Sequence, residues 1–124
     1  MAITLGAITT LATAARDALS NAFNTLANTG AGAAHLIVRD TGNVTLVDFT
    51  LDTTSAFGAS ATGVITVDVS PAITATAAAS GAPTNYIITD SSAATILTGS
   101  ASGDSVTSGL SYTLSSFTLT CPAS

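Results

Sequence analysis

The sequence predicts a mainly β fold with one N-terminal helix, arranged as an antiparallel, jelly-roll-like β-sandwich with the helix packed against it. Two observations lead to this prediction. Apolar residues recur with a period of about 3.6 in only one segment, at residues 10–28. From residue 35 onward, short runs of alternating apolar and polar residues are separated by turn-forming residues. The 124 residues fit one domain, and we expect an N-terminal arm at 1–8 followed by a single domain at 9–124.

The predicted helix at 10–28 has one apolar and one polar face. Its apolar stripe comprises Leu11, Ala15, Ala18, Leu19, Ala22, Phe23 and Leu26, and its polar stripe comprises Arg16, Asp17, Ser20, Asn21, Asn24 and Asn28. We expect the apolar stripe to cover a sheet and the polar stripe to face water. Thr9 or Thr10 can cap the first turn, and residues 28–30 tolerate the left-handed conformation in which helices often end.

Strand character recurs along the rest of the chain. The predicted strands are residues 35–38, 44–51, 64–69, 73–77, 86–89, 95–98 and 106–121. Turn residues at 40–43 and 90–92 predict two hairpins. In the last stretch the apolar phase changes at Ser115-Ser116, which predicts a β-bulge or bend there. The segment 52–63 is interpreted as a loop, because Phe57 is its single large apolar residue.

The predicted core consists of the large residues on the inward phases. These are Leu19, Phe23, Phe49, Ile65, Val67, Ile88, Leu114, Phe117 and Leu119. The core is thin for its length, because much of the 47% hydrophobic content is alanine, only 5% of residues are aromatic and Trp is absent. A thin core favours assembly with other subunits.

The composition excludes several classes of partner. Charged residues make up only 7%, against about 25% in an ordinary domain, and the net charge is −5. Nucleic acid is not an expected partner, because phosphate binding needs clustered basic residues. An uncharged surface is typical of a subunit that packs against copies of itself, so we expect a homo-oligomer. The start of the chain has neither a basic region nor a long apolar run, so we expect no signal peptide and no membrane contact.

The sequence predicts no catalytic, cofactor or metal site, and we expect that the protein is not an enzyme. His35 is the single histidine, and we interpret it as a packed or capping side chain rather than a catalytic base. Residues 99–103 resemble a nucleophile elbow, but Ala101 stands where the nucleophile must be. Asp90 and Asp104 are interpreted as turn residues whose carboxylates bond nearby main chain. Cys121 has no cysteine to pair with and is interpreted as a small hydrophobe.

Several short motifs occur in the order in which one known family carries them. Residues 85–91 and 95–100 resemble its final hairpin, and Gly109-Leu110 with residues 116–120 resemble its last strand. Residues 15–22 and 34–38 resemble its opening helix and the strand that follows. The family is a group of small virion proteins of tailed bacteriophages. This chain departs from it at Ser92-Ala93, where the family more often has glycine, and in the segment 52–63.

The resemblance implies a virion structural subunit of the capsid decoration or cement type, made in the host cytoplasm and located on the capsid surface. Its expected partner is the major capsid protein, and a trimer is expected over a dimer because many decoration proteins occupy three-fold positions. A tail or head–tail junction subunit and a bacterial surface or fimbrial subunit remain as alternatives. We expect the arm at 1–8 and the loop at 52–63 to contact the partner. The contacting residues would be Ile3, Leu5, Ile8 and Phe57.

Overall fold

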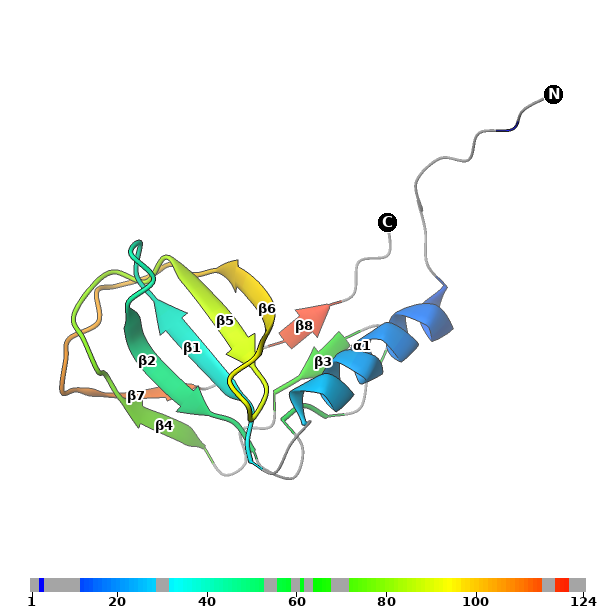
Figure 1. Cartoon of the computed structure of the whole chain (residues 1–124), viewed down its shortest axis with the longest axis horizontal. Helices are drawn as coiled ribbons and strands as arrows, with labels where there is room; N and C mark the ends of the chain where they lie inside the picture. Colours follow the sequence, from blue (N-terminus) through cyan, green and yellow to red (C-terminus); the bar gives the residue numbers. More distant parts are fainter. Residues whose placement is uncertain are drawn as a thin grey trace.

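A computed structural model of the protein describes residues 3, 12–28, 32–52, 56–58, 61, 64–67, 72–114 and 118–120. Within these residues the chain forms one helix and eight strands (Figure 1). Their order is α1 (Thr13–Ala27), β1 (His35–Arg39), β2 (Thr45–Thr50), β3 (Val64–Thr66), β4 (Ile73–Thr76), β5 (Asn85–Thr89), β6 (Thr95–Ser100), β7 (Ser111–Leu114) and β8 (Thr118–Thr120). The predicted mainly β fold with one N-terminal helix is confirmed.

The main sheet contains four strands in the order β2-β1-β5-β6, and every neighbouring pair is antiparallel. Both hairpins predicted from the turn residues are formed, because β1 pairs with β2 and β5 pairs with β6. The two hairpins meet at the central pair β1–β5, in which Ile37 lies opposite Ile87.

The remaining strands form two smaller sheets. Strand β4 pairs with β7 and β3 pairs with β8, both antiparallel. The last predicted strand, at 106–121, therefore contributes two strands that pair with different partners. Ser115-Ser116, where we predicted a bulge or bend, lies outside the described residues. The described sheets are not closed on one another, so a sandwich or jelly-roll arrangement is not confirmed.

The core lies where the main sheet, the β4–β7 pair and β3 face one another. Of the predicted core residues, Phe49, Ile65, Val67 and Ile88 are buried, and Phe23 and Leu114 are partly buried and pack against them. Phe117 and the side chain of Leu119 lie outside the described part of the chain. Leu19 was wrongly assigned to the core, because it is 54% exposed.

Helix α1 is shorter than predicted and lies beside β3, away from the main sheet (Figure 1). It begins after Ala12, whose methyl group cannot cap it, and the proposed caps Thr9 and Thr10 lie outside the described residues. At the other end Asn28 has φ −90° and ψ 7°, so this residue is not left-handed as expected. Of the predicted arm at 1–8, the structure describes Ile3 alone.

The same turn closes both hairpins of the main sheet. In the first, the N–H of Asn43 donates to the carbonyl of Asp40 at 3.0 Å, and Asn43 is left-handed with φ 62°. In the second, the N–H of Ala93 donates to the carbonyl of Asp90 at 3.1 Å, and Ala93 has φ 67°. A type I turn followed by one left-handed residue is a common three-residue hairpin loop.

The aspartate that opens each turn also bonds through its side chain. The Asp90 carboxylate accepts hydrogen bonds from the N–H groups of Ser92 at 2.8 Å and Ala94 at 3.0 Å. Asp40 accepts the equivalent pair, from Gly42 and Val44, at the same two distances. The interpretation of Asp90 as a turn residue is confirmed.

Candidate interaction surface

Most of the described apolar stripe of α1 faces solvent, and Phe23 is the exception. Leu19 and Leu26 are each 54% exposed, and Ala15, Ala18 and Ala22 are exposed beside them. In contrast, Ser20 from the predicted polar stripe is only 3% exposed and Ala27 is fully buried. Apart from Phe23, the described residues of the stripe do not cover a sheet as expected, and the helix is turned with much of its polar face inward.

Two asparagines on the inward face hold α1 to the rest of the chain. The Asn24 side-chain amide donates to the carbonyl of Phe57 at 3.0 Å and its oxygen accepts the N–H of Phe57 at 3.2 Å. This is the bonding that a neighbouring strand would offer. One turn later, the Asn28 side-chain oxygen accepts the N–H of Ala56 at 2.9 Å. An asparagine satisfies a buried main chain in this way and leucine cannot, which explains the orientation of the helix.

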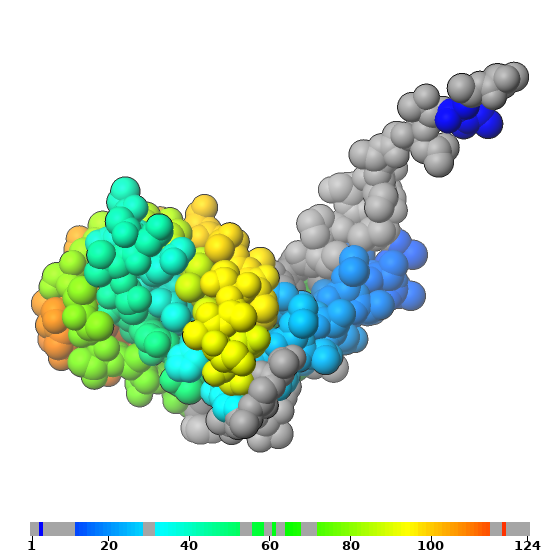
Figure 2. Space-filling view, in the orientation of Figure 1, coloured from blue at the N-terminus to red at the C-terminus, as the bar shows by residue number. Residues whose placement is uncertain are grey.

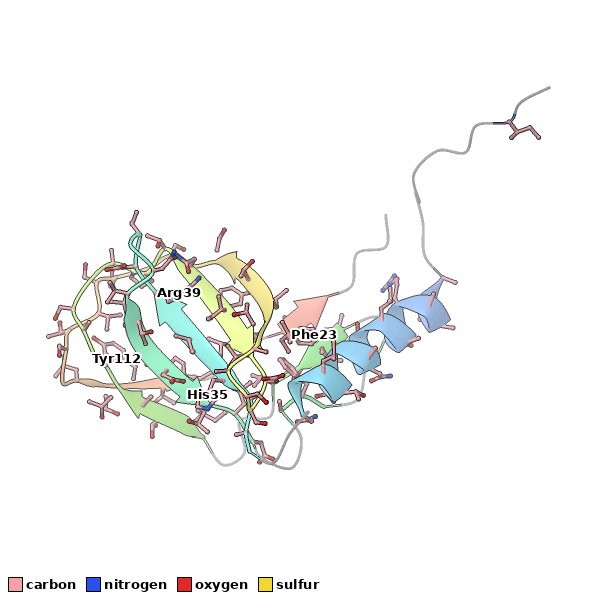
Figure 3. The ribbon with its side chains drawn as sticks, viewed as in Figure 1. Phe23, His35, Arg39 and Tyr112 are labelled. Atoms are coloured by element: carbon pink, nitrogen blue, oxygen red, sulfur yellow. The ribbon has the colours of Figure 1, made fainter. Side chains whose placement is uncertain are left out.

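Aromatic packing completes this attachment. The rings of Phe23 and Phe57 meet edge to face, with centroids 5.7 Å apart and an interplanar angle of 67°. Phe23 is labelled on α1 in Figure 3. Phe57 is fully buried and also bridges to Val67. Sequence reasoning made Phe57 a partner-binding residue, but its burial leaves the side chain no surface to offer a partner.

The outward stripe of α1 is a candidate docking surface. Single exposed leucines are normal on proteins, whereas a contiguous apolar stripe marks an interaction site. Burying a leucine side chain completely contributes about 1.5–3 kcal/mol, so covering the exposed halves of Leu19 and Leu26 would contribute roughly 1 kcal/mol each. In Figure 2 the surface of α1, coloured blue, extends away from the main sheet.

Other predicted contact residues are only partly described. Ile3 is 81% exposed, whereas Leu5 and Ile8 lie outside the described residues. In the predicted loop at 52–63, Ala56 is buried with Phe57, while Gly58 and Ala61 are exposed. That segment is therefore interior in part, rather than a surface loop throughout.

Strand β6 forms an outer edge of the main sheet. Its six residues, TILTGS, include no charged residue and no proline, which are the usual protections of an exposed edge. Main-chain groups alternate in direction along a strand, and by the hairpin register those of Ile96, Thr98 and Ser100 point away from β5. The opposite edge, at β2, already receives a bond, from the N–H of Ala78 to the carbonyl of Leu46 at 2.8 Å.

Polar side chains on the outer face of the main sheet pair with one another. The Nδ1–H of His35 donates to the Asp48 carboxylate at 2.7 Å, and the two side chains are 34% and 45% exposed. At the other end of β1, where Figure 3 labels Arg39, the Nε–H of Arg39 donates to the side-chain oxygen of Asn85 at 2.9 Å. Pairs with this exposure contribute about 0–1 kcal/mol. His35 thus has a cross-strand partner, rather than the packed or capping role that we expected.

A pocket of about 290 Å³ lies between the main sheet and β7. Its lining includes the apolar residues Val38, Val47, Phe49 and Leu114 and the hydroxyl-bearing residue Tyr112. The Tyr112 oxygen accepts the N–H of Thr107 at 2.9 Å. The volume is at the lower limit of about 300–1,000 Å³ for small-molecule sites, and no charged residue lines it.

Searches for other kinds of site and for relatives add no candidate. Within the described residues, no three His, Cys, Asp or Glu side chains are grouped so that they could hold a metal ion. No helix in that part of the chain is both long and apolar enough to cross a membrane. Comparison with protein-family models, curated proteins and solved structures finds no match.

Proposed function

We propose that the protein is a structural subunit of a bacteriophage virion that binds the outer surface of the capsid and stabilises the shell. The observation that carries the proposal is the outward apolar stripe of α1. A subunit that works alone gains nothing from exposing this stripe, whereas a subunit of an assembly can bury it. The family resemblance of the motifs, the small number of charges and the β-rich fold support the same proposal.

The proposed contact with the shell is made by the arm at 1–8, and the major capsid protein is its partner. Ile3, Leu5 and Ile8 supply the apolar side chains of this arm. An extended segment can add a strand to a neighbouring sheet, with main-chain bonds for affinity and alternate side chains for specificity. A lattice presents the same binding site many times, so contacts that are weak singly become strong when several are made together.

Two other positions remain as alternative proposals. A subunit of the tail or head–tail junction would use the same surfaces but be present in few copies. A bacterial surface or fimbrial subunit would share the uncharged, β-rich character. None of these functions needs a catalytic group, a cofactor or a metal ion.

Copy number and shell binding test the proposal together. Purified protein is mixed with empty capsid shells that lack it, the shells are sedimented, and the bound protein is measured against the major capsid protein by gel densitometry. A near-stoichiometric ratio is expected. A ratio of a few copies per shell would move the proposal to the tail, and no binding would reject it.

Removing the arm tests the contact surface. A chain lacking residues 1–8 should keep its circular dichroism spectrum and melting temperature, because the core found among the described residues begins at Ala27. It should no longer sediment with shells. The matched control is Val44→Ser, which alters a side chain 50% exposed beside the first hairpin turn and should bind normally. Normal binding by the shortened chain would show that the arm does not carry the contact.

A further inference from the structure

We propose that the outward stripe of α1 packs against α1 of a second copy of this chain, in a parallel arrangement around a common axis. The inference rests on the proposed function in one respect: that function is argued from the outward stripe of α1, and the inference names what covers this stripe. It concerns the protein alone, before any shell is bound.

The spacing of the exposed residues is the first argument. The seam consists of four members of the outward stripe, Ala15, Leu19, Ala22 and Leu26, separated by four, three and four residues, and all four are exposed. An alternation of three and four is the seam by which one helix packs along another helix of the same kind. A surface of this kind is complementary to itself, which makes a second α1 its natural partner.

Charge is the second argument. The chain has a net charge of −5, so copies repel one another unless their contact surface is free of charge. The stripe has no charged residue. The two charges of α1 belong to half-buried residues outside the stripe, with Asp17 on the opposite side of the helix and Arg16 on its inward flank. A basic or acidic partner would find no complementary charge on this stripe, whereas a second copy brings no like charge against it.

Side-chain size is the third argument. The leucines are seven residues apart, so each can insert between residues of the facing helix, and the small side chains of Ala15 and Ala22 let the two backbones approach closely. In a closed cyclic assembly such as the expected trimer, equivalent helices that run along the rotation axis are parallel. In that arrangement the N-terminal ends of the helices lie at one end of the bundle, so arms that precede α1 in the chain could act on the shell together.

Light scattering of the purified protein tests the self-association. The wild type should be an oligomer, and the double variant Leu19→Asn/Leu26→Asn should associate at least about tenfold more weakly, because each copy loses two apolar contacts. Its circular dichroism spectrum should be unchanged, since both leucines are surface residues. The matched control is Leu110→Asn, whose side chain is 55% exposed but lies outside α1, and it should leave the oligomer intact.

Cysteine cross-linking tests the parallel arrangement. In a Cys121→Ser background, Leu26→Cys brings its own symmetry mates together and should give a disulfide-linked dimer under mild oxidation. Ala14→Cys, which is exposed on α1 but off the stripe, should stay monomeric on a non-reducing gel. Equal cross-linking at both positions, or none at Leu26→Cys, would overturn the arrangement.

The two proposals fail in different ways. A wild type that is monomeric at high concentration, or a leucine variant with the wild-type size, overturns the α1 contact while shell binding can still be measured. An oligomer that dissociates on leucine replacement but never sediments with shells supports the α1 contact and rejects the capsid function.

Discussion

The two hairpins of the main sheet follow one plan but differ in their side chains. Adding 50 to the residue numbers of β1–β2 gives those of β5–β6, and the register shift at Val38/Arg39 recurs at Ile88/Thr89. The bond that closes the open end also recurs, from Leu51 N–H to the Ala34 carbonyl at 2.9 Å and from Ala101 N–H to the Thr84 carbonyl at 3.0 Å. The sheet therefore has an approximate two-fold axis between Ile37 and Ile87.

The two hairpins differ in side chains because different elements pack on them. Phe49 in β2 is 6% exposed in the core, and β4 lies against this strand. The equivalent residue of β6 is Gly99, above which lies the ring of Tyr86 from the neighbouring strand. Both turns open with an aspartate, Asp40 in the first hairpin and Asp90 in the second. The comparison teaches that turn chemistry determines the backbone of a hairpin, while the layer above it determines its large side chains.

The largest expected effect on stability is in the β1–β2 hairpin, against which β4 lies. Phe49→Ala should lower the free energy of unfolding by about 3–5 kcal/mol, because it removes a buried aromatic ring and leaves a cavity. Urea denaturation followed by circular dichroism measures the change. Thr98→Ala, at an exposed position of β6, is the control and should change stability little. A loss under 1 kcal/mol would mean that Phe49 does not have the core role that separates the two hairpins.

The equivalent position of the second hairpin should resist a larger side chain. A Cβ at Gly99 would overlap the Tyr86 ring, so Gly99→Ala should lower the free energy of unfolding by about 1–3 kcal/mol. In a Tyr86→Ala background the overlap is gone, and Gly99→Ala should have a much smaller effect. A double-mutant cycle with purely additive effects would show that the ring does not restrict this position.

The two turn aspartates should be equally important. Asp40→Ala and Asp90→Ala each remove an acceptor of two main-chain N–H bonds, and each should lower stability by about 1–2 kcal/mol. Asp→Asn at either position keeps an acceptor oxygen and should have less effect. Thermal unfolding measures both variants. A loss of stability at one turn alone would contradict the equivalence of the two hairpins.

The smallest expected effect distinguishes the left-handed residues. Alanine is strained at φ 67°, whereas asparagine tolerates this region, so Ala93→Asn should raise stability by about 0.5–1 kcal/mol. The reciprocal change Asn43→Ala should lower it by a similar amount. Differential scanning calorimetry of both variants checks the pair, and a change of the same sign in both would contradict the strain argument.

Local signals in the sequence predicted the strands well and the packing of the helix poorly. The hairpins depend on neighbouring residues such as Asp40 and Asn43, so their turns can be read directly from the chain. The orientation of α1 depends on Asn24 finding Phe57, more than 30 residues further along the chain. Helical periodicity identifies an apolar stripe, but it does not say whether that stripe packs against the rest of the same chain or against another molecule. An asparagine pair one turn apart, at 24 and 28, was the available signal, and it was interpreted as a solvated face.

The side-chain amide of Asn24 also links the local unfolding of α1 to that of β3. This side chain bonds both main-chain groups of Phe57, and the N–H of Gly58 donates to the Thr66 carbonyl of β3 at 2.9 Å. The helix therefore cannot detach without breaking the bonds that also hold the segment 56–58, which lies against β3. Helix, segment and β3 should therefore open as one unit. In native-state hydrogen exchange, the amides in the second half of α1 should share the opening free energy of Ile65, while those of β1 and β5 remain protected through that event.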